Sequence, residues 1–260
     1  MKNSNKIITL SLYNRYDYTF EVLKHLACCK GIEDYRIIPV IDHDNKNGRN
    51  QADITQILYT AAKQTRLSID QPRYHEGNVG CNSNIFTCLN IGFKITDFLI
   101  HLEDDIILAS DALEYFEWCN KEYHDDPTVF TVDVYNNKEY KTKPSAFEVE
   151  RSQSFKPWGW ATWLDRWIDI KERWQFSYGP RFEGGKQVFN GGGWDVAMKQ
   201  YLRGNRYRVF PKLPRCKNIG AIGGCHTPSK EWHEEKHVKP VKFWSNDIDI
   251  SSMAINFQEI

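Results

Sequence analysis

Short apolar runs and helix-like periodic segments take turns along the first hundred residues of the chain. The apolar runs are almost continuous, as in strands buried on both faces, and they predict strands at 7–12, 35–41, 66–69 and 98–103. Apolar residues three or four positions apart predict the helices between them, at about 16–28, 51–65 and 80–93. Repeated strand–helix units of this kind predict an α/β fold, with a mainly parallel sheet and helices on both faces.

The pattern changes beyond residue 134. We predict strands at 129–134 and 207–210, a helix at about 194–202, and loops with short antiparallel strands at 135–157. Tryptophans crowd residues 158–174, and a glycine run at 191–193 precedes the helix. No internal repeat occurs and no linker is long enough to separate two domains, so we predict a single domain over residues 1–260.

The most informative segment is an acidic triplet inside an apolar run. Glu103, Asp104 and Asp105 come at the end of the strand predicted at 98–103, and Ile106–Leu108 then resume the apolar pattern. Neighbouring carboxylates at the end of a buried strand repel one another and lose solvation, and a hard cation such as Mg²⁺ or Mn²⁺ would remove both penalties. The alternative is an exposed acidic turn before a helix that begins near Ser110.

Composition narrows the classes of partner. The 260 residues carry 34 basic and 34 acidic side chains, and this balance gives no support to a nucleic-acid or membrane partner. No apolar run approaches the ~20 residues that span a bilayer, and the polar start at 1–6 lacks the features of a secretory signal. Seven cysteines without a CxxC pair predict reduced thiols in a cytoplasmic protein rather than a zinc site or a disulfide framework.

Three blocks of residues, taken in order, connect the chain to a known family. They are the acidic triplet with 110–116 (SDALEYF), then 157–163 (PWGWATW) with 165–167 (DRW), and finally landmarks at Trp194–Asp195, Arg203–Gly204, Pro211, Arg215 and Asn218–Gly220. In these blocks the chain resembles glycosyltransferases of the GT-A fold. The likeness is to the inverting animal N-acetylglucosaminyltransferases of N-glycan and O-mannosyl cores, and to bacterial sugar transferases of polysaccharide gene clusters.

The resemblance implies a Rossmann-like nucleotide-binding half at 1–107 and an acceptor and catalytic half at 108–260, built on a mixed central sheet in an α/β/α sandwich. It also implies metal-dependent transfer, with inversion, of a hexosyl or N-acetylhexosaminyl group from a nucleotide sugar to a glycan or other hydroxyl acceptor. We expect a UDP-sugar as donor and Mn²⁺ or Mg²⁺ as cofactor. A lipid-linked acceptor would bring the protein to a membrane surface without a transmembrane segment.

The same resemblance assigns roles to the acidic residues. Asp105 matches the carboxylate that holds a metal bridging both phosphates of the donor, while Glu103 and Asp104 would face the ribose and the donor sugar. Asp42, at the end of the second predicted strand, matches a carboxylate that accepts the uracil N3–H. Its alternative role is to cap a turn.

Further donor contacts are expected from two other segments. Arg15, just beyond the first strand, would pair with phosphate or ribose, although an arginine at the start of a helix is often exposed. Tyr13 would offer its ring to the base. The Trp158, Gly159 and Trp160 segment matches the family's Gly-Trp block, and ordinary core packing is the alternative for its rings.

Asp195 is the predicted general base that takes the proton of the acceptor hydroxyl. The animal enzymes carry a second acid directly after this position, whereas this chain has Val196. If the base of those enzymes is the second acid, Asp195 does not correspond to it and its assignment as the base fails. Capping of the helix that follows is the alternative role of Asp195. His226 matches a late histidine that some GT-A enzymes place on the metal or the diphosphate, and a solvated histidine is the alternative.

Two other classes of function compete with this reading. A nucleotidyltransferase usually has a glycine-rich loop after the first strand, and residues 12–16 contain no glycine. A carbohydrate-binding module without catalysis could use the tryptophans, but it has no need of a buried acidic triplet. Metal-dependent binding of a nucleotide separates the module from the transferase.

Overall fold

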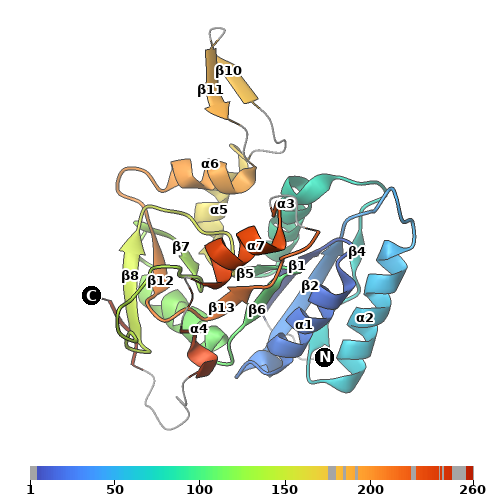
Figure 1. Cartoon of the computed structure of the whole chain (residues 1–260), viewed down its shortest axis with the longest axis horizontal. Helices are drawn as coiled ribbons and strands as arrows, with labels where there is room; N and C mark the ends of the chain where they lie inside the picture. The colour runs from blue at the N-terminus through green and yellow to red at the C-terminus, as the bar shows by residue number, and fades with distance from the viewer. Residues whose placement is uncertain are drawn as a thin grey trace.

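The computed structural model describes residues 5–174, 180–183, 186–190, 193–223, 227–239, 241, 243–247 and 256–259. Its centre is a ten-stranded mixed sheet (Figure 1). The strands lie in the order β14 (Gln258–Glu259), β8 (Glu148–Ser152), β12 (Tyr207–Pro211), β7 (Val129–Asp133), β9 (Trp160–Trp163), β5 (Phe98–Glu103), β1 (Lys6–Leu12), β2 (Tyr35–Ile41) and β3 (Ser68–Ile69), and β4 (Arg73–Tyr74) also pairs with β2.

Strand direction brings several strand ends to one edge of the sheet. β5, β1, β2 and β3 are parallel to one another. β9 is antiparallel to both β5 and β7, so that β7 and its parallel neighbour β12 run in the same direction as β5. The carboxyl ends of these parallel strands therefore share an edge, which is where ligands bind in open α/β sheets.

Helices cover both faces of the sheet. One face packs against α1 (Tyr16–Ala27), α2 (Asn50–Gln64) and α4 (Ala112–Tyr123), and the other against α3 (Gly80–Gly92), α5 (Leu164–Lys171) and α6 (Trp194–Tyr201). Successive side chains of a strand point to opposite faces, so Ile7 belongs to one hydrophobic core and Ile8 to the other. The predicted α/β/α sandwich with a mixed central sheet is confirmed.

Smaller elements decorate this sandwich. β6 (Ile106–Leu108) pairs with β13 (Cys216–Asn218), and β10 (Pro180–Glu183) pairs with β11 (Lys186–Asn190) in a hairpin that projects from the body in Figure 1. α7 (Lys230–His233) continues into the π-helical turn η2 (Glu234–Val238). Single turns occur at η1 (Ile32–Asp34) and η3 (Ser245–Asp247).

Two expectations about the whole chain can be compared with the structure. Within the part of the chain that the structure describes, no helix combines the length and the apolar character needed to cross a membrane. The six described cysteines are free thiols, as predicted, and Cys225 lies outside the described residues. The main sheet takes strands from both predicted halves, and the single-domain organisation stays a prediction.

Candidate active site

The acidic triplet lies at the carboxyl edge of the sheet, where β5 ends. Glu103 is the last residue of β5, and Asp104 and Asp105 turn the chain into β6. Asp104 is 3% exposed and Asp105 is 9% exposed, so this segment is not an exposed acidic turn. Leu102 and Ile106 on either side are fully buried, and their packing draws the carboxylates out of water.

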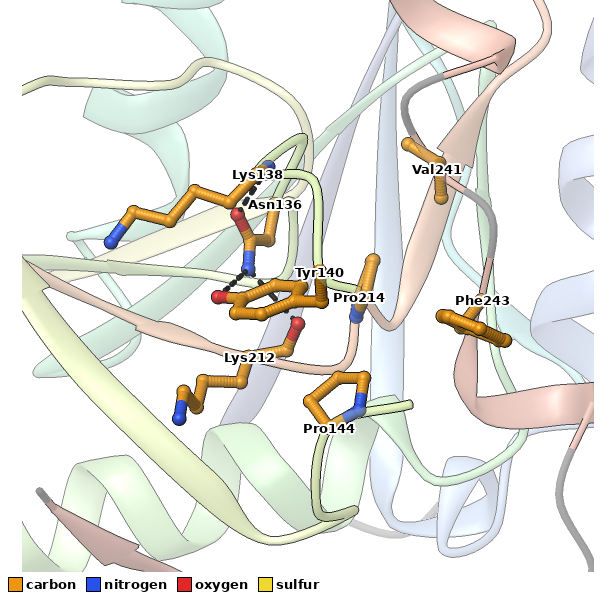
Figure 2. A pocket seen from close by; sticks show the side chains of 8 residues that line it. All are labelled: Asn136, Lys138, Tyr140, Pro144, Lys212, Pro214, Val241 and Phe243. Carbon is orange, nitrogen blue, oxygen red and sulfur yellow. Dashed lines mark hydrogen bonds between the residues drawn. The ribbon is translucent and has the colours of Figure 1, made fainter. Parts of the chain in front are cut away.

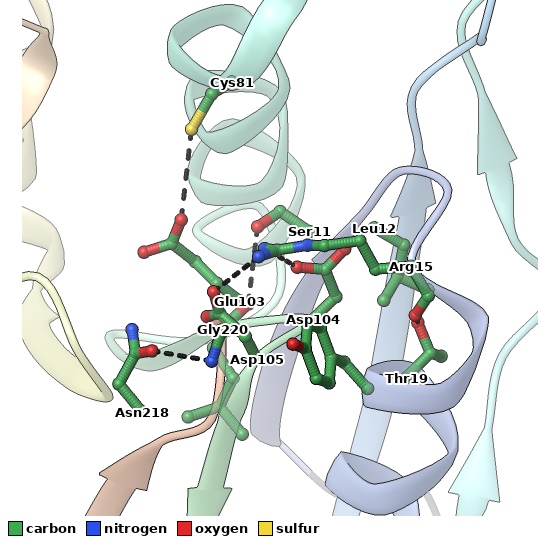
Figure 3. Close-up of polar contacts among 12 residues, drawn as sticks. Ser11, Leu12, Arg15, Thr19, Cys81, Glu103, Asp104, Asp105, Asn218 and Gly220 are labelled. Atoms are coloured by element: carbon green, nitrogen blue, oxygen red, sulfur yellow. Dashed lines mark hydrogen bonds and ion pairs between the residues drawn. The ribbon is translucent and has the colours of Figure 1, made fainter. Parts of the chain in front are cut away.

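Arg15 supplies counter-charge to this acidic cluster (Glu103, Asp104 and Asp105). It directly precedes α1, and its guanidinium lies across the two aspartates (Figure 3). Nη1 donates to Asp105 Oδ2 at 2.7 Å, and Nη2 pairs with Asp104. Burial lowers the pKa of Arg15, but the charges of Asp104 and Asp105 outweigh burial and raise this pKa above its usual value. The arginine is therefore held in its charged form between the aspartates.

Burial perturbs the carboxylates themselves. It raises the pKa of Glu103 well above the ordinary range, and repulsion from Asp105 adds to the shift. Burial also raises the pKa of Asp104 to about 6, although Arg15 opposes the change. With all three carboxylates ionised, three negative charges face the single positive charge of Arg15, which leaves a net charge of −2. Such an arrangement is typical of a functional site.

A segment from the second half of the chain closes over Asp105. The N–H of Ile219 donates to the backbone oxygen of Asp105 at 2.9 Å. A Cβ atom at Gly220 would lie 2.1 Å from Asp105 Oδ2 and 3.1 Å from Arg15 Nη1, so only glycine lets the backbone pass this close. Gly220 therefore lets the 218–220 segment pack directly against the carboxylate, and the sequence indicates this glycine only as a family landmark.

A late histidine, His233, lies in this region. Its Nε2 lies 3.0 Å from Asn218 Oδ1, and the same oxygen accepts the N–H of Gly220 at 2.8 Å. His233 is 3% exposed; burial lowers its pKa, while the charge of Asp105 acts in the opposite direction. The predicted metal residue His226 lies outside the described residues. Nothing in the local sequence of α7 distinguishes His233 from the other histidines of the polar tail.

The residues around Asp105 fit a hard divalent cation that also binds a ligand. Asp104 and Asp105 offer carboxylate oxygens, which suit Mg²⁺ and Mn²⁺. The Gly220 backbone packs against Asp105 Oδ2 and holds this carboxylate in place. In the described part of the chain, no three His, Cys, Asp or Glu side chains form a ready-made metal cage. The arrangement therefore suits an ion held by one or two protein ligands, with phosphate oxygens and water completing its shell.

Asp42 lies at the end of β2 and is engaged by the protein itself. Its Oδ1 accepts the N–H groups of His43 and Val79, both at 2.9 Å, and its Oδ2 accepts the N–H of Gly80 at 2.9 Å. These bonds satisfy backbone donors at the start of α3, so Asp42 ties β2 to that helix. Its binding of uracil stays a prediction, and this structural role stands beside it.

Tyr13 links two parts of the site. Its backbone N–H donates to Asp104 and helps to hold the pKa of that carboxyl down. Its carbonyl accepts a hydrogen bond from Asn50 Nδ2 at 2.8 Å, which fixes the loop before α2. The half-buried residue lies between the end of β1 and Arg15, and its predicted contact with the base stays a prediction.

Asp195 lies in the first turn of α6. Its charge contributes to the raised pKa of Glu103, so the two carboxylates interact although they come from distant parts of the chain. The side chain is 30% exposed and lies 3.7 Å from Lys199 Nζ. The capping position of α6 is Gly193, and among the described residues no side chain caps this helix. Asp195 therefore keeps an accessible carboxylate.

Aromatic packing holds the start of α6. The Trp194 ring stacks on Trp160 and on Trp174, with centroids 5.5 Å and 5.3 Å apart. The N–H of Trp194 donates to Asn82 Oδ1, and Trp174 Nε1 donates to the carbonyl of Asn82 at 3.0 Å. Since Cys81 contacts Glu103, the start of α3 connects the acidic cluster with the helix that carries Asp195 (Figure 3).

The Trp158, Gly159 and Trp160 segment divides between core and surface. Trp160 is fully buried, so its side chain would influence a ligand only through its neighbours. Gly159 has a φ of 66°, and a Cβ atom there would lie 2.7 Å from Val134 Cγ2. Trp158 is half-buried, and its ring lies edge-on between Tyr135 and His237, at 4.4 Å from each. Trp158 is thus the member of the three best placed for a ligand.

Several solved structures share this fold. That of S. aureus TarS 1-349 matches with a TM-score of 0.51 and 14% identity, over 81% of this chain and 59% of that one. A second structure of S. aureus TarS matches with a TM-score of 0.50 and 16% identity, over 83% of this chain and 37% of that one. The structure of the mannosyltransferase PcManGT from Pyrobaculum calidifontis, in complex with GDP-Man and Mn²⁺, matches with a TM-score of 0.50 and 13% identity. The match covers 80% of this chain and 57% of that one.

These neighbours are glycosyltransferases, and the GT-A fold class predicted from the sequence is confirmed. The chain spans less than two thirds of the length of each of them. No family model and no curated protein matches the sequence. The finer likeness to the animal N-acetylglucosaminyltransferases stays a prediction.

Proposed function

We propose that the protein is a metal-dependent inverting glycosyltransferase that moves a hexosyl or N-acetylhexosaminyl group from a UDP-sugar to a hydroxyl group of a glycan. The observation that carries this proposal is the acidic cluster. On the carboxyl edge of a GT-A sheet, Glu103 and Asp104 have raised pKa values, Arg15 pairs with Asp104 and Asp105, and the backbone of Gly220 packs directly against the Asp105 carboxylate. The complex of PcManGT with GDP-Man and Mn²⁺ supports a nucleotide sugar as the donor class.

The donor half of the site would work as follows. Asp105 would hold the divalent cation, and the sequence-predicted His226 would be a second ligand or a contact of the diphosphate. The bound cation supplies positive charge that stabilises the departing nucleoside diphosphate. Glu103 and Asp104 face the donor sugar and the ribose. Arg15, which now satisfies both aspartates, is close enough to turn to a phosphate when a cation takes over their charge.

The nucleoside would lie between Tyr13 and Asp42. A carboxylate offers about four acceptor positions, and three of those on Asp42 accept backbone N–H groups. The remaining position is the acceptor for the uracil N3–H. Uracil offers one such donor at N3, so a single free lone pair is sufficient for this contact.

Asp195 would act on the acceptor. Its accessible carboxylate takes the proton of the attacking hydroxyl, while the bond to the diphosphate breaks on the far side of the sugar. One displacement inverts the anomeric carbon and needs no covalent intermediate. A cytoplasmic location and an acceptor carried on a lipid at the membrane surface are further parts of the proposal.

A panel of nucleotide sugars tests this function. We expect Mn²⁺-dependent hydrolysis of a UDP-sugar, with a slower reaction for GDP-sugars, followed with and without hydroxyl acceptors. The Asp195→Asn variant should lose about 10²–10⁴-fold in turnover with an unchanged affinity for UDP, because asparagine cannot accept the proton. Absence of any metal-dependent reaction across the panel would reject the proposal, and an α-linked product from an α-linked donor, seen by NMR, would reject inversion.

A further inference from the structure

Lys156 is a half-buried lysine in the loop between β8 and β9. Lys156 follows Phe155, whose ring packs edge-on against Trp160 and Trp194, and it precedes Trp158 by two positions. Within the ranges that the structure describes, no hydrogen bond or ion pair joins its ammonium group to another side chain. A lysine at such a position normally gains a carboxylate partner or reaches into water.

The charges around Lys156 are mostly of its own sign. Burial lowers the pKa of Lys156, and repulsion from Arg208, in β12, and from Lys199, in α6, adds to this shift. Asp133 attracts Lys156, but both of its oxygens lie 2.7 Å from Arg208 Nη1. Lys199 is the partner of Asp195. Three positive and two negative charges in this group leave a net charge of +1.

The same neighbourhood holds two buried nitrogen atoms without a hydrogen-bond partner among the described residues. Arg208 Nε and His237 Nδ1 are buried without a hydrogen-bond partner in the described structure, and His237 interacts electrostatically with Lys156. An arginine nitrogen can only donate a hydrogen bond. Buried polar groups without partners are rare, and each of them needs a physical explanation. Arg208 Nε is sealed in by its pair with Asp133, so the two atoms mark a polar neighbourhood beside Lys156 and not a contact that its ligand reaches.

Two other lysines of the second half of the chain, unlike Lys156, have carboxylate partners. Lys138 and Lys212 line a shallow pocket at the ends of β7 and β12 (Figure 2). Lys138 pairs with Glu150, and Lys212 lies 2.9 Å from Glu148. Lysines of this region therefore find carboxylates where the chain provides them. Lys156 has none, although Asp133 lies nearby, because Arg208 already occupies that carboxylate.

We propose that Lys156 binds an anionic group of the acceptor, a phosphate or a carboxylate close to the hydroxyl that receives the sugar. This inference rests on the proposed function, since it places Lys156 on the side of the site that holds Asp195. The donor diphosphate needs the acidic cluster and its cation, whereas the net positive group around Lys156 needs an anion. The negative charge of the acidic cluster would thus mark the donor side of the site, and the positive charge around Lys156 the acceptor side.

Equilibrium binding to the protein loaded with UDP and Mn²⁺ tests the proposal. The probes are glucose, glucose 6-phosphate and glucuronate, titrated by calorimetry. We expect at least one anionic probe to bind about tenfold more tightly than glucose, as a charge-assisted hydrogen bond provides. Lys156→Gln should abolish this difference and Lys156→Arg should keep it. The matched control Lys121→Gln, on the exposed side of α4, should also keep it.

Each result of these titrations leads to a different conclusion. A larger gain for glucose 6-phosphate identifies a phosphate acceptor, and a larger gain for glucuronate identifies a carboxylate. Equal binding of the three probes, or a preference that survives Lys156→Gln, overturns the proposal. A lower affinity of Lys156→Gln for UDP also overturns it, because Lys156 would then serve the donor. Failure of the proposed function would appear separately, as wild-type protein that binds no UDP with Mn²⁺.

Discussion

Two arginine–aspartate contacts lie toward the same edge of the sheet and differ in what they leave unpaired. Arg208 holds both oxygens of Asp133, and the two side chains are 4% and 0% exposed. Arg15 faces three carboxylates, and its side chain is 17% exposed. The first contact is balanced in charge and sealed from solvent. The second has excess negative charge and is bordered by Gly220, whose backbone approaches Asp105 closely.

The difference separates a part of the scaffold from a binding site. A balanced, sealed pair has no capacity for a further ion, and its loss leaves an uncompensated buried charge. Arg215 and Asp111, 2.8 Å apart with side chains 0% and 2% exposed, form a second pair of this kind. The acidic cluster is the opposite case, because a cation or a cationic complex would lower its energy. Comparable ion pairs can thus differ in role through charge balance alone.

The largest expected effect concerns the sealed pair. Arg208→Met should cost about 3 kcal/mol of unfolding free energy, because Asp133 then loses its buried partner. Urea denaturation measures this cost. Mn²⁺ should restore none of it, since Asp133 is inaccessible to an added ion. Recovery of stability with Mn²⁺ would show that the two contacts are not different in kind.

Gly220→Ala tests the close approach of the backbone to Asp105. The new methyl group would lie 2.1 Å from Asp105 Oδ2, so Asp105 or the backbone must shift. We expect a loss of about 1–3 kcal/mol in the binding of UDP with Mn²⁺, as for overpacked sites. Gly48→Ala is the matched control, because a Cβ atom there meets nothing within 4 Å. Equal affinities of the two variants would contradict this role of Gly220.

Arg15→Gln tests whether arginine and metal compete for the same carboxylates. Removal of the guanidinium frees Asp104 and Asp105, so Mn²⁺ alone should bind about tenfold more tightly at a pH where both are ionised. Mn²⁺ should also raise the thermal midpoint of this variant, since a ligand that binds the folded state stabilises it. Weaker or unchanged binding of Mn²⁺ would show that the ion and Arg15 use different oxygens.

The smallest effect is a pH dependence at the edge of the site. Burial, with help from His233 and Lys156, lowers the pKa of His237 from 6.5 to about 4. The neutral form is favoured by folding, so this contribution to stability is complete above pH 6.5 and is lost as the pH falls through about 4. His237→Phe keeps the packing on Trp158 and cannot titrate. Calorimetry should show a smaller decrease in its thermal midpoint over this range; equal decreases would exclude the effect.

The sequence predicted most of the sheet and missed the elements that depend on distant contacts. The strands at 7–12, 35–41 and 98–103 agree with β1, β2 and β5 to within one residue. β9 was missed because its four residues, two of them tryptophans, show no extended pattern. Trp160 packs into one core and Trp163 into the other, which only the neighbouring strands reveal. α7 was missed because it has only four residues, in a polar segment.

The candidate site was predictable where its residues are close in sequence. Three adjacent carboxylates after an apolar run are visible locally, and Arg15 follows a predicted strand. Gly220 and His233 reach Asp105 only through pairing of β13 with β6 and the return of α7, more than a hundred residues later. The bonds of Asp42 to α3 are equally non-local. Sequence periodicity carries no information about such contacts.

Calorimetric titration of UDP, with and without Mn²⁺, tests the central claim that the acidic cluster holds a cation for a nucleoside diphosphate. We predict that the wild-type protein binds UDP in the presence of Mn²⁺ and that Asp105→Asn loses this metal-dependent binding while it keeps a cooperative unfolding transition. Asp125→Asn, at a carboxylate that is 99% exposed, is the matched control and should bind as the wild type does. Unchanged Mn²⁺-dependent affinity in Asp105→Asn would contradict the claim.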